Sequence, residues 1–179
     1  MIMDTLETIC SRKSVRTYTG EPVSEEELDK ILLAGQAAPV GMGRYADMHL
    51  TVIKDRELLE KIEKSAAKMF NRPGMHPLYG APTLILVSAK APSAGQENVT
   101  YSNAAIIAHN MILEATELGV GAVHIWGATA ALASDSALVA ELGIPEGFVP
   151  CCAAAVGKTA AKYSMRNIPQ NRIATDCIG

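Results

Sequence analysis

The residues best suited to chemistry form a basic run, Ser11-Arg12-Lys13-Ser14-Val15-Arg16, near the start of the chain. A phosphate monoester carries close to two negative charges and several strong acceptor oxygens. Arginine meets such oxygens with a planar fork of donors, lysine with a compact charge, and serine with one short hydrogen bond. Turned inward, the run would clamp a phosphate. A short charged run is also commonly a solvated turn, so the run alone leaves both interpretations open.

Composition narrows the class of protein. The chain has 179 residues and a net charge of −3, which predicts a single domain over residues 1–179 and argues against nucleic-acid binding. No apolar run reaches the ~18 residues that span a bilayer, so no membrane association is expected. The four cysteines form no CxxC pair, and no metal site is predicted. Unpaired thiols and the lack of a basic n-region in residues 1–4 favour the cytoplasm.

A second candidate is the small-residue loop Pro39-Val40-Gly41-Met42-Gly43-Arg44. Its glycines permit unusual dihedrals and the close approach of a flat ligand to the backbone. A plain turn between a helix and a strand would have the same composition. No GxGxxG motif occurs, so nothing indicates a Rossmann dinucleotide site.

Periodicity and capping residues predict the elements that must position these residues. We expect strands at 48–53, 83–89, 120–126 and 149–156, and loops at 70–80 and 91–99. We expect helices over 4–10, from a Ser24 capping box to Pro39, after Asp55, over 103–118, and from Ser134 to near Gly143. The alternation indicates a two- or three-layer arrangement of helices and strands. The 103–118 helix is apolar almost all round, which predicts burial in the core or at a subunit interface. The apolar residues of the 158–179 tail favour draping over a surface.

Four blocks, taken in order, resemble the FMN-dependent nitroreductase family over nearly the whole chain. They are Arg12–Tyr18, the loop Ala38–Arg44, the run from Asn110 through Gly121 to Gly127, and Ala153–Lys158 with Arg166 downstream. The resemblance implies an α+β, three-layer α/β/α sandwich with a central, mainly antiparallel sheet. It also implies a homodimer whose terminal segments wrap around the partner, with tightly bound FMN at the interface.

By the family pattern, the FMN phosphate and polar chain contact Arg12, Lys13, Ser14 and Arg16, with Arg166 as a further cation from the tail. The same pattern places Pro39, Val40 and Gly41 against the flavin ring, and Ile125, Trp126 and Gly127 along it from the other subunit or the other face. The sequence departs from the pattern with Val40 where Ser is frequent, Gly43 where Asn is frequent, and Tyr45-Ala46-Asp47 in the next segment. These departures make the expected ring contacts more backbone-dependent.

The implied activity is oxidoreduction. NADH or NADPH delivers hydride to flavin N5, leaves, and is replaced by a nitroaromatic, quinone or similar electron-poor acceptor, in a ping-pong sequence. Flavin supplies the redox chemistry, so no catalytic side chain is predicted. Three alternatives stay open: another FMN reaction such as flavin breakdown or reductive dehalogenation, a non-enzymatic flavin-binding module, and a nucleotide-phosphate enzyme. The last is disfavoured because no Walker loop or carboxylate cluster for Mg²⁺ occurs.

Overall fold

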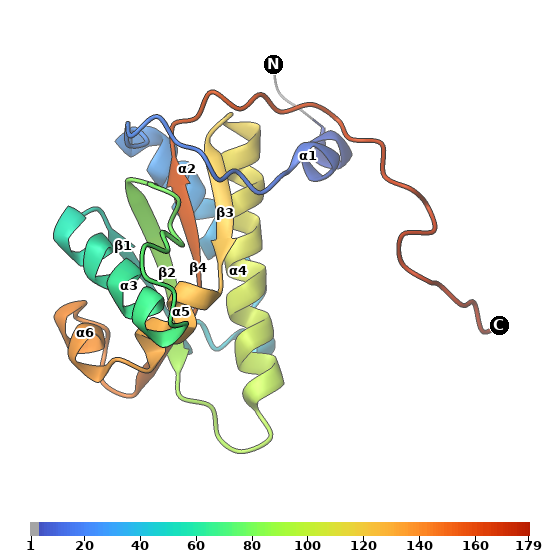
Figure 1. Cartoon of the computed structure of the whole chain (residues 1–179). Helices are drawn as coiled ribbons and strands as arrows, with labels where there is room; N and C mark the ends of the chain where they lie inside the picture. The colour runs from blue at the N-terminus through green and yellow to red at the C-terminus, as the bar shows by residue number, and fades with distance from the viewer. Residues whose placement is uncertain (1–3) are drawn as a thin grey trace.

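The computed structural model describes residues 4–179, and their organising element is a four-stranded antiparallel sheet (Figure 1). Residues 1–3, part of the segment examined for a signal peptide, lie outside the described residues. The strands are β1 (Met48–Ile53), β2 (Thr83–Lys90), β3 (Gly121–Ile125) and β4 (Phe148–Gly157), in the spatial order β1-β2-β4-β3. Leu86 at the centre of β2 pairs with Thr51 and with Ala153. β1 and β3 are therefore the two edge strands.

Helices cover both faces of the sheet, which confirms the predicted three-layer α+β sandwich. α2 (Glu25–Gln36) and α4 (Glu97–Glu117) share one apolar core with the sheet, and α3 (Arg56–Met69), α5 (Gly127–Ala133) and α6 (Ser136–Glu141) share the other (Figure 1). α1 (Thr5–Ser11) packs on α4. β2 is buried on both faces except at its last residue, as its continuous apolar run predicts.

Local sequence signals explain several helix starts. The Ser24 side chain accepts a hydrogen bond from Glu27 N, and Ser24 N donates to Glu27 Oε2, so the predicted capping box forms. The Asp55 side chain accepts from Leu58 N at the start of α3. Each bond satisfies an amide that the first helical turn leaves without a partner.

Two predicted boundaries were wrong. α4 begins at Glu97, six residues before the expected Asn103, because the polar stretch 97–102 continues the helix beyond its apolar part. α5 was missed because Gly127 and a run of small residues follow directly on β3 without a capping side chain. Asp135 then caps α6, which starts at Ser136 rather than Ser134.

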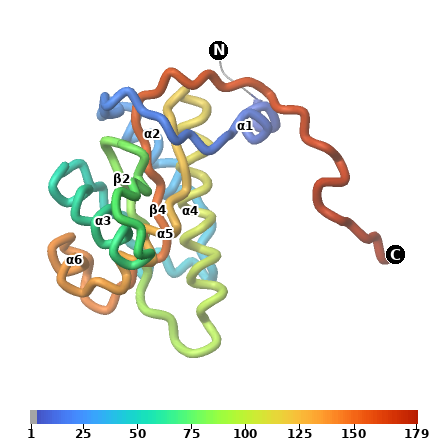
Figure 2. Tube along the Cα trace, viewed as in Figure 1, coloured from blue at the N-terminus to red at the C-terminus, as the bar shows by residue number. Residues whose placement is uncertain are grey.

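The two ends of the chain lie side by side along one end of the sheet and then separate (Figures 1 and 2). The tail follows the N-terminal segment as far as Arg166, whose backbone amide donates to Cys10 O. Beyond it the tail leaves the body of the chain, with Ile173 79% and Ile178 fully exposed. The predicted draping is therefore seen for its first part. None of the helices within residues 4–179 combines the length and apolarity that crossing a membrane requires.

Candidate functional site

The basic run is held against the edge strand β3. Val15 N donates to Ala122 O at 3.0 Å, and a Cβ built on Gly121 would lie 3.0 Å from the Val15 side chain. A side chain at 121 would force its neighbours, Val15 among them, to shift by a few tenths of an ångström. The Tyr18 hydroxyl then donates to Ala155 O at 3.1 Å, which ties the end of the run to β4. These contacts fix where the cations on either side of Val15 can reach.

The tail brings a second set of cations to the same place. Arg166 Nε donates to Cys10 O at 2.8 Å, directly before the basic run. Lys13 Nζ donates to Lys162 O at 2.6 Å and lies 5.5 Å from the centroid of the Tyr163 ring. Two segments about 150 residues apart in sequence are thus joined by side-chain contacts, and Figure 2 shows their backbones running side by side.

The joined segments create an excess of positive charge. Partial burial lowers the pKa of Arg12, and the charges of Arg166 and Arg172 lower it further. Within residues 4–179, no ion pair joins any of these three arginines, Lys13 or Arg16 to a carboxylate. Guanidinium groups gathered in this way favour a multiply charged anion with several acceptor oxygens. The donor set therefore fits a phosphate monoester.

The other two residues of the predicted clamp lie apart from this cluster. Ser14 and Arg16 are exposed, and the Arg16 guanidinium lies 5.6 Å from the centroid of the Tyr79 ring. Tyr79 belongs to the segment that precedes β2 and adopts a positive φ of 57°. Arg12, Lys13 and Arg166 thus converge, whereas Arg16 turns to another neighbour.

The predicted ring-lining residues Ile125, Trp126 and Gly127 stand at the end of β3. Ile125 is buried, Trp126 is 54% exposed, and Gly127 opens α5. A Cβ on Gly127 would meet the Phe70 ring at 3.3 Å. An exposed indole beside closely approached backbone gives a flat surface on which an aromatic ligand can lie.

Two histidines beside Trp126 were not among the predicted site residues. His124 Nε2 lies 3.4 Å from His109 Nδ1 of α4, and the His124 and Trp126 rings lie 5.8 Å apart at an interplanar angle of 21°. Burial, His109 and Arg12 lower the pKa of His124 to about 4. The sequence held one signal for this cluster, namely a polar residue within an otherwise apolar strand.

Pro39, Val40 and Gly41 lie at the opposite edge of the sheet, because their loop leads into β1. Val40 is buried, and Gly41 N donates to Asn103 Oδ1 at 3.1 Å beside a cavity of about 190 Å³. Three strand spacings, roughly 14 Å, separate the two edge strands. Within one chain, the structure therefore does not bring this loop together with Trp126.

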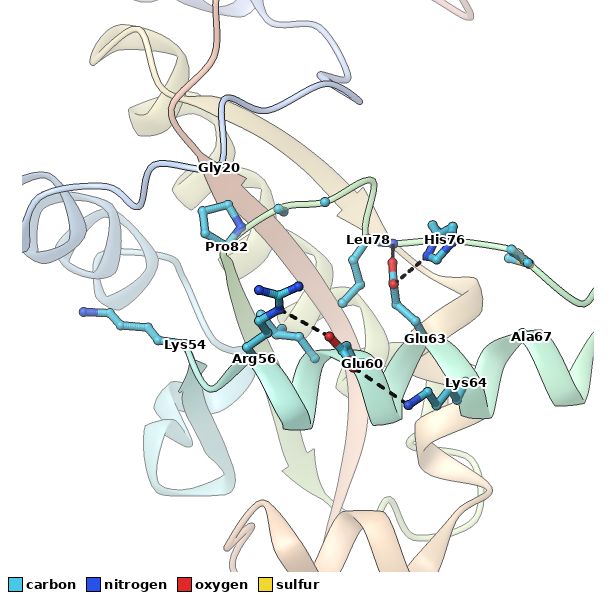
Figure 3. Close-up of a pocket in the computed structure, with 15 residues that line it drawn as sticks. Gly20, Lys54, Arg56, Glu60, Glu63, Lys64, Ala67, His76, Leu78 and Pro82 are labelled. Atoms are coloured by element: carbon cyan, nitrogen blue, oxygen red, sulfur yellow. Dashed lines mark hydrogen bonds and ion pairs between the residues drawn. The ribbon is translucent and has the colours of Figure 1, made fainter.

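A larger groove, of about 620 Å³, lies between α3 and residues 74–82 (Figure 3). None of the predicted site residues lines it. Glu63 accepts from Leu78 N at 3.1 Å and contacts His76 Nδ1 at 2.9 Å, while Glu60 bridges Arg56 and Lys64. These charges are paired within the groove wall, so the groove lacks the excess positive charge of the Arg12 cluster.

Helices on both faces of an antiparallel sheet, with an arginine cluster at one edge, define an α+β protein with a candidate anion site beside its edge strand. Comparison with known proteins identifies its family. Residues 9–158 match the sequence model of the nitroreductase family, and the chain belongs to that family.

Its relatives agree in sequence and in fold. A protein of Methanothermobacter thermautotrophicus named "Putative NADH dehydrogenase/NAD(P)H nitroreductase" is 31% identical over 93% of this chain and 83% of its own length. The structure of a nitroreductase with bound FMN from Bacteroides fragilis is 27% identical, has a TM-score of 0.83 and covers 97% of this chain and 99% of that one. An FMN-bound nitroreductase from Desulfitobacterium hafniense is 25% identical at the same TM-score, over 98% and 100%.

Proposed function

We propose that this protein is an FMN-dependent NAD(P)H oxidoreductase that reduces nitroaromatic, quinone or similar electron-poor acceptors, with the whole chain forming one FMN-binding domain. The observation that carries the proposal is that Arg12 acts on both Arg166 and His124, and that the His124 ring lies 5.8 Å from the exposed Trp126 ring, in a member of the nitroreductase family. One end of FMN is a phosphate and the other a flat aromatic ring, and this cluster offers a partner for each.

The roles of the side chains follow from their positions. Arg12, Lys13 and Arg166 would hold the phosphate, and Ser14 and Arg16 the neighbouring polar chain. Ile125, Trp126 and Gly127 would support the ring. FMN supplies hydride-transfer chemistry when bound. No side chain then needs to act as a nucleophile, which agrees with a site built from cations, an indole and backbone.

We further propose that the site is completed by a second copy of the chain. Pro39, Val40 and Gly41 lie at the other edge of the sheet from Trp126, so one molecule cannot present both to one ring. A partner's loop can fill that role in a symmetric dimer. Apolar side chains that this chain leaves uncovered support the same conclusion; they include Leu6, Ile9, Ile106 and Ile173. The four free cysteines suit the reducing cytoplasm proposed from the sequence.

The visible spectrum of the purified protein tests the proposal. We expect the absorbance of oxidised flavin, and its loss when NADH or NADPH is added without oxygen. With a quinone present, initial rates at several fixed acceptor concentrations should give parallel double-reciprocal lines, since the donor leaves before the acceptor binds. Protein that stays colourless after incubation with FMN would refute the cofactor assignment. Bound flavin that neither donor reduces would refute the reaction. Light scattering coupled to gel filtration tests the dimer.

A further inference from the structure

The histidine pair His109 and His124 has a geometry suited to sharing a proton. The rings come from α4 and β3 and are parallel to within 2°, with centroids 5.7 Å apart. The distance between His109 Nδ1 and His124 Nε2 is 3.4 Å. Adding the distance from each nitrogen to the centre of its own ring accounts for the whole centroid separation, so the two nitrogens lie on the line that joins the centroids. The rings therefore lie edge to edge in one plane, joined by an N–H···N hydrogen bond rather than stacked face to face.

The pair lies beside the strand against which the basic run is held, because Val15 N donates to Ala122 O two residues before His124. Arg12, from the N-terminal segment, lowers the pKa of both histidines, after burial in each case and after His109 in the case of His124. Among residues 4–179, no carboxylate contributes to either shift. The uncharged Trp126 ring follows His124 along β3, and His124 Nδ1 is buried without a hydrogen-bond partner in the described chain. Among the described residues, the charge that acts on both rings is therefore the positive charge of Arg12.

A phosphate dianion at Arg12 would reverse this balance. Its charge offsets the guanidinium that disfavours the imidazolium form, so the pair binds a proton more readily in the complex. The hydrogen bond between the rings becomes charge-assisted and stronger once one ring is protonated. His109 is the more exposed ring, so the proton from water can reach it first and be shared with His124 across the Nδ1–Nε2 contact.

We propose that His109 and His124 form a further part of the cofactor site, and that the pair takes up one proton from water when a phosphate group binds at Arg12. This inference rests on the proposed FMN site and adds a proton to its binding equilibrium. The sign follows from linkage: the complex holds more protons than the free protein, so the pair strengthens binding as the pH falls towards the raised pKa. Protonation of the phosphate, near pH 6, acts in the opposite direction, so variants are needed to separate the two effects.

Calorimetric titration of the apoprotein with FMN, in two buffers of different ionisation enthalpy, counts the protons taken up. Near pH 6.5 we expect the wild type to take up more protons per FMN than the His109→Gln/His124→Gln variant, by up to one. At a pH below both titration midpoints, the affinity difference between the two should reach about tenfold for each unit by which phosphate raises the pKa of the pair, and near pH 6.5 it should be smaller. His76→Gln, which removes an exposed histidine paired with Glu63, should leave the proton count unchanged.

Nuclear magnetic resonance of the imidazole nitrogens gives a second readout, independent of turnover. Inorganic phosphate added to the wild type should raise the titration midpoints of His109 and His124 and leave that of His76 in place. If the double variant fails to fold, His109→Gln, at the exposed end, replaces it. FMN binding with equal proton counts in wild type and variant, or midpoints unmoved by phosphate, would overturn this inference and leave the proposed function intact. Failure of FMN to bind at all would instead overturn the proposed function.

Discussion

Replacing Arg12 with glutamine should weaken FMN binding without weakening the fold. In the described structure Arg12 is partly buried and faces Arg166 and Arg172, both of which lower the pKa of its guanidinium. Within residues 4–179 no carboxylate forms an ion pair with it. The guanidinium charge is thus disfavoured in the folded apoprotein, and a bound anion would stabilise it. Its removal should affect the two forms in opposite directions.

The size of the effect follows from the hydrogen bonds that are lost. A hydrogen bond to a charged group contributes about 1.5–3 kcal/mol, so loss of one bond from Arg12 to phosphate should raise the Kd for FMN roughly 10- to 150-fold. The assay is quenching of flavin fluorescence on titrating apoprotein into FMN. Thermal unfolding of the apoprotein tests the predicted effect on the fold. The Tm of Arg12→Gln should equal or exceed that of the wild type.

Arg56→Gln is the matched control. Arg56 is also an arginine, but its side chain is 92% exposed and paired with Glu60 on α3 (Figure 3). Its removal should change the Kd by less than about twofold, since exposed pairs contribute little. Equal FMN affinity in Arg12→Gln and wild type would refute the clamp. A marked loss of apoprotein stability in Arg12→Gln would show that the arginine is structural instead.

Three further predictions concern the scaffold. Gly157→Ala should lower the free energy of unfolding by about 1–3 kcal/mol in urea titrations, because the added Cβ would lie 2.5 Å from Pro82 Cδ; an unchanged midpoint would contradict the packing described. Burial raises the pKa of Glu27, but hydrogen bonds from Lys158 and the Ser24 cap outweigh it and hold the pKa below its ordinary 4.5. The wild type should therefore lose more stability than Glu27→Gln as the pH falls below 4.5, and parallel pH profiles would exclude this. Burial raises the pKa of Cys152 to about 12, so this thiol should react with a disulfide reagent at pH 8 only after denaturation; rapid labelling of the native protein would disprove its burial.

Much of the fold could be predicted because its signals are local. The capping box at Ser24, the aspartate at 55 and the alternation of 48–53 each depend on residues within a few positions of one another. α5 carries no such signal, since its seven residues are small and have no capping side chain. The early start of α4 was missed because Glu97–Ser102 is mostly polar, and only the remainder of that helix carries the apolar run that predicts it.

The candidate site could be predicted only in pieces. The sequence shows the basic run directly. Its proximity to Arg166 depends on the path of the tail along the N-terminal segment, which the sequence does not show. The contact between His109 and His124 joins a helix to a strand, and no spacing rule for metal ligands or catalytic motifs selects it. The separation of Gly41 from Trp126 is likewise a property of strand order, which residue types alone do not encode.

The strand order also determines how this chain should behave when it is isolated from any partner. The outer side of β3 is covered by the backbone at Val15, whereas within residues 4–179 no strand pairs with the outer side of β1. An open row of amides and carbonyls is a template for strands of other molecules and hence for aggregation. Variants of the apolar surface that prevent the proposed dimer should therefore increase turbidity when the protein is concentrated.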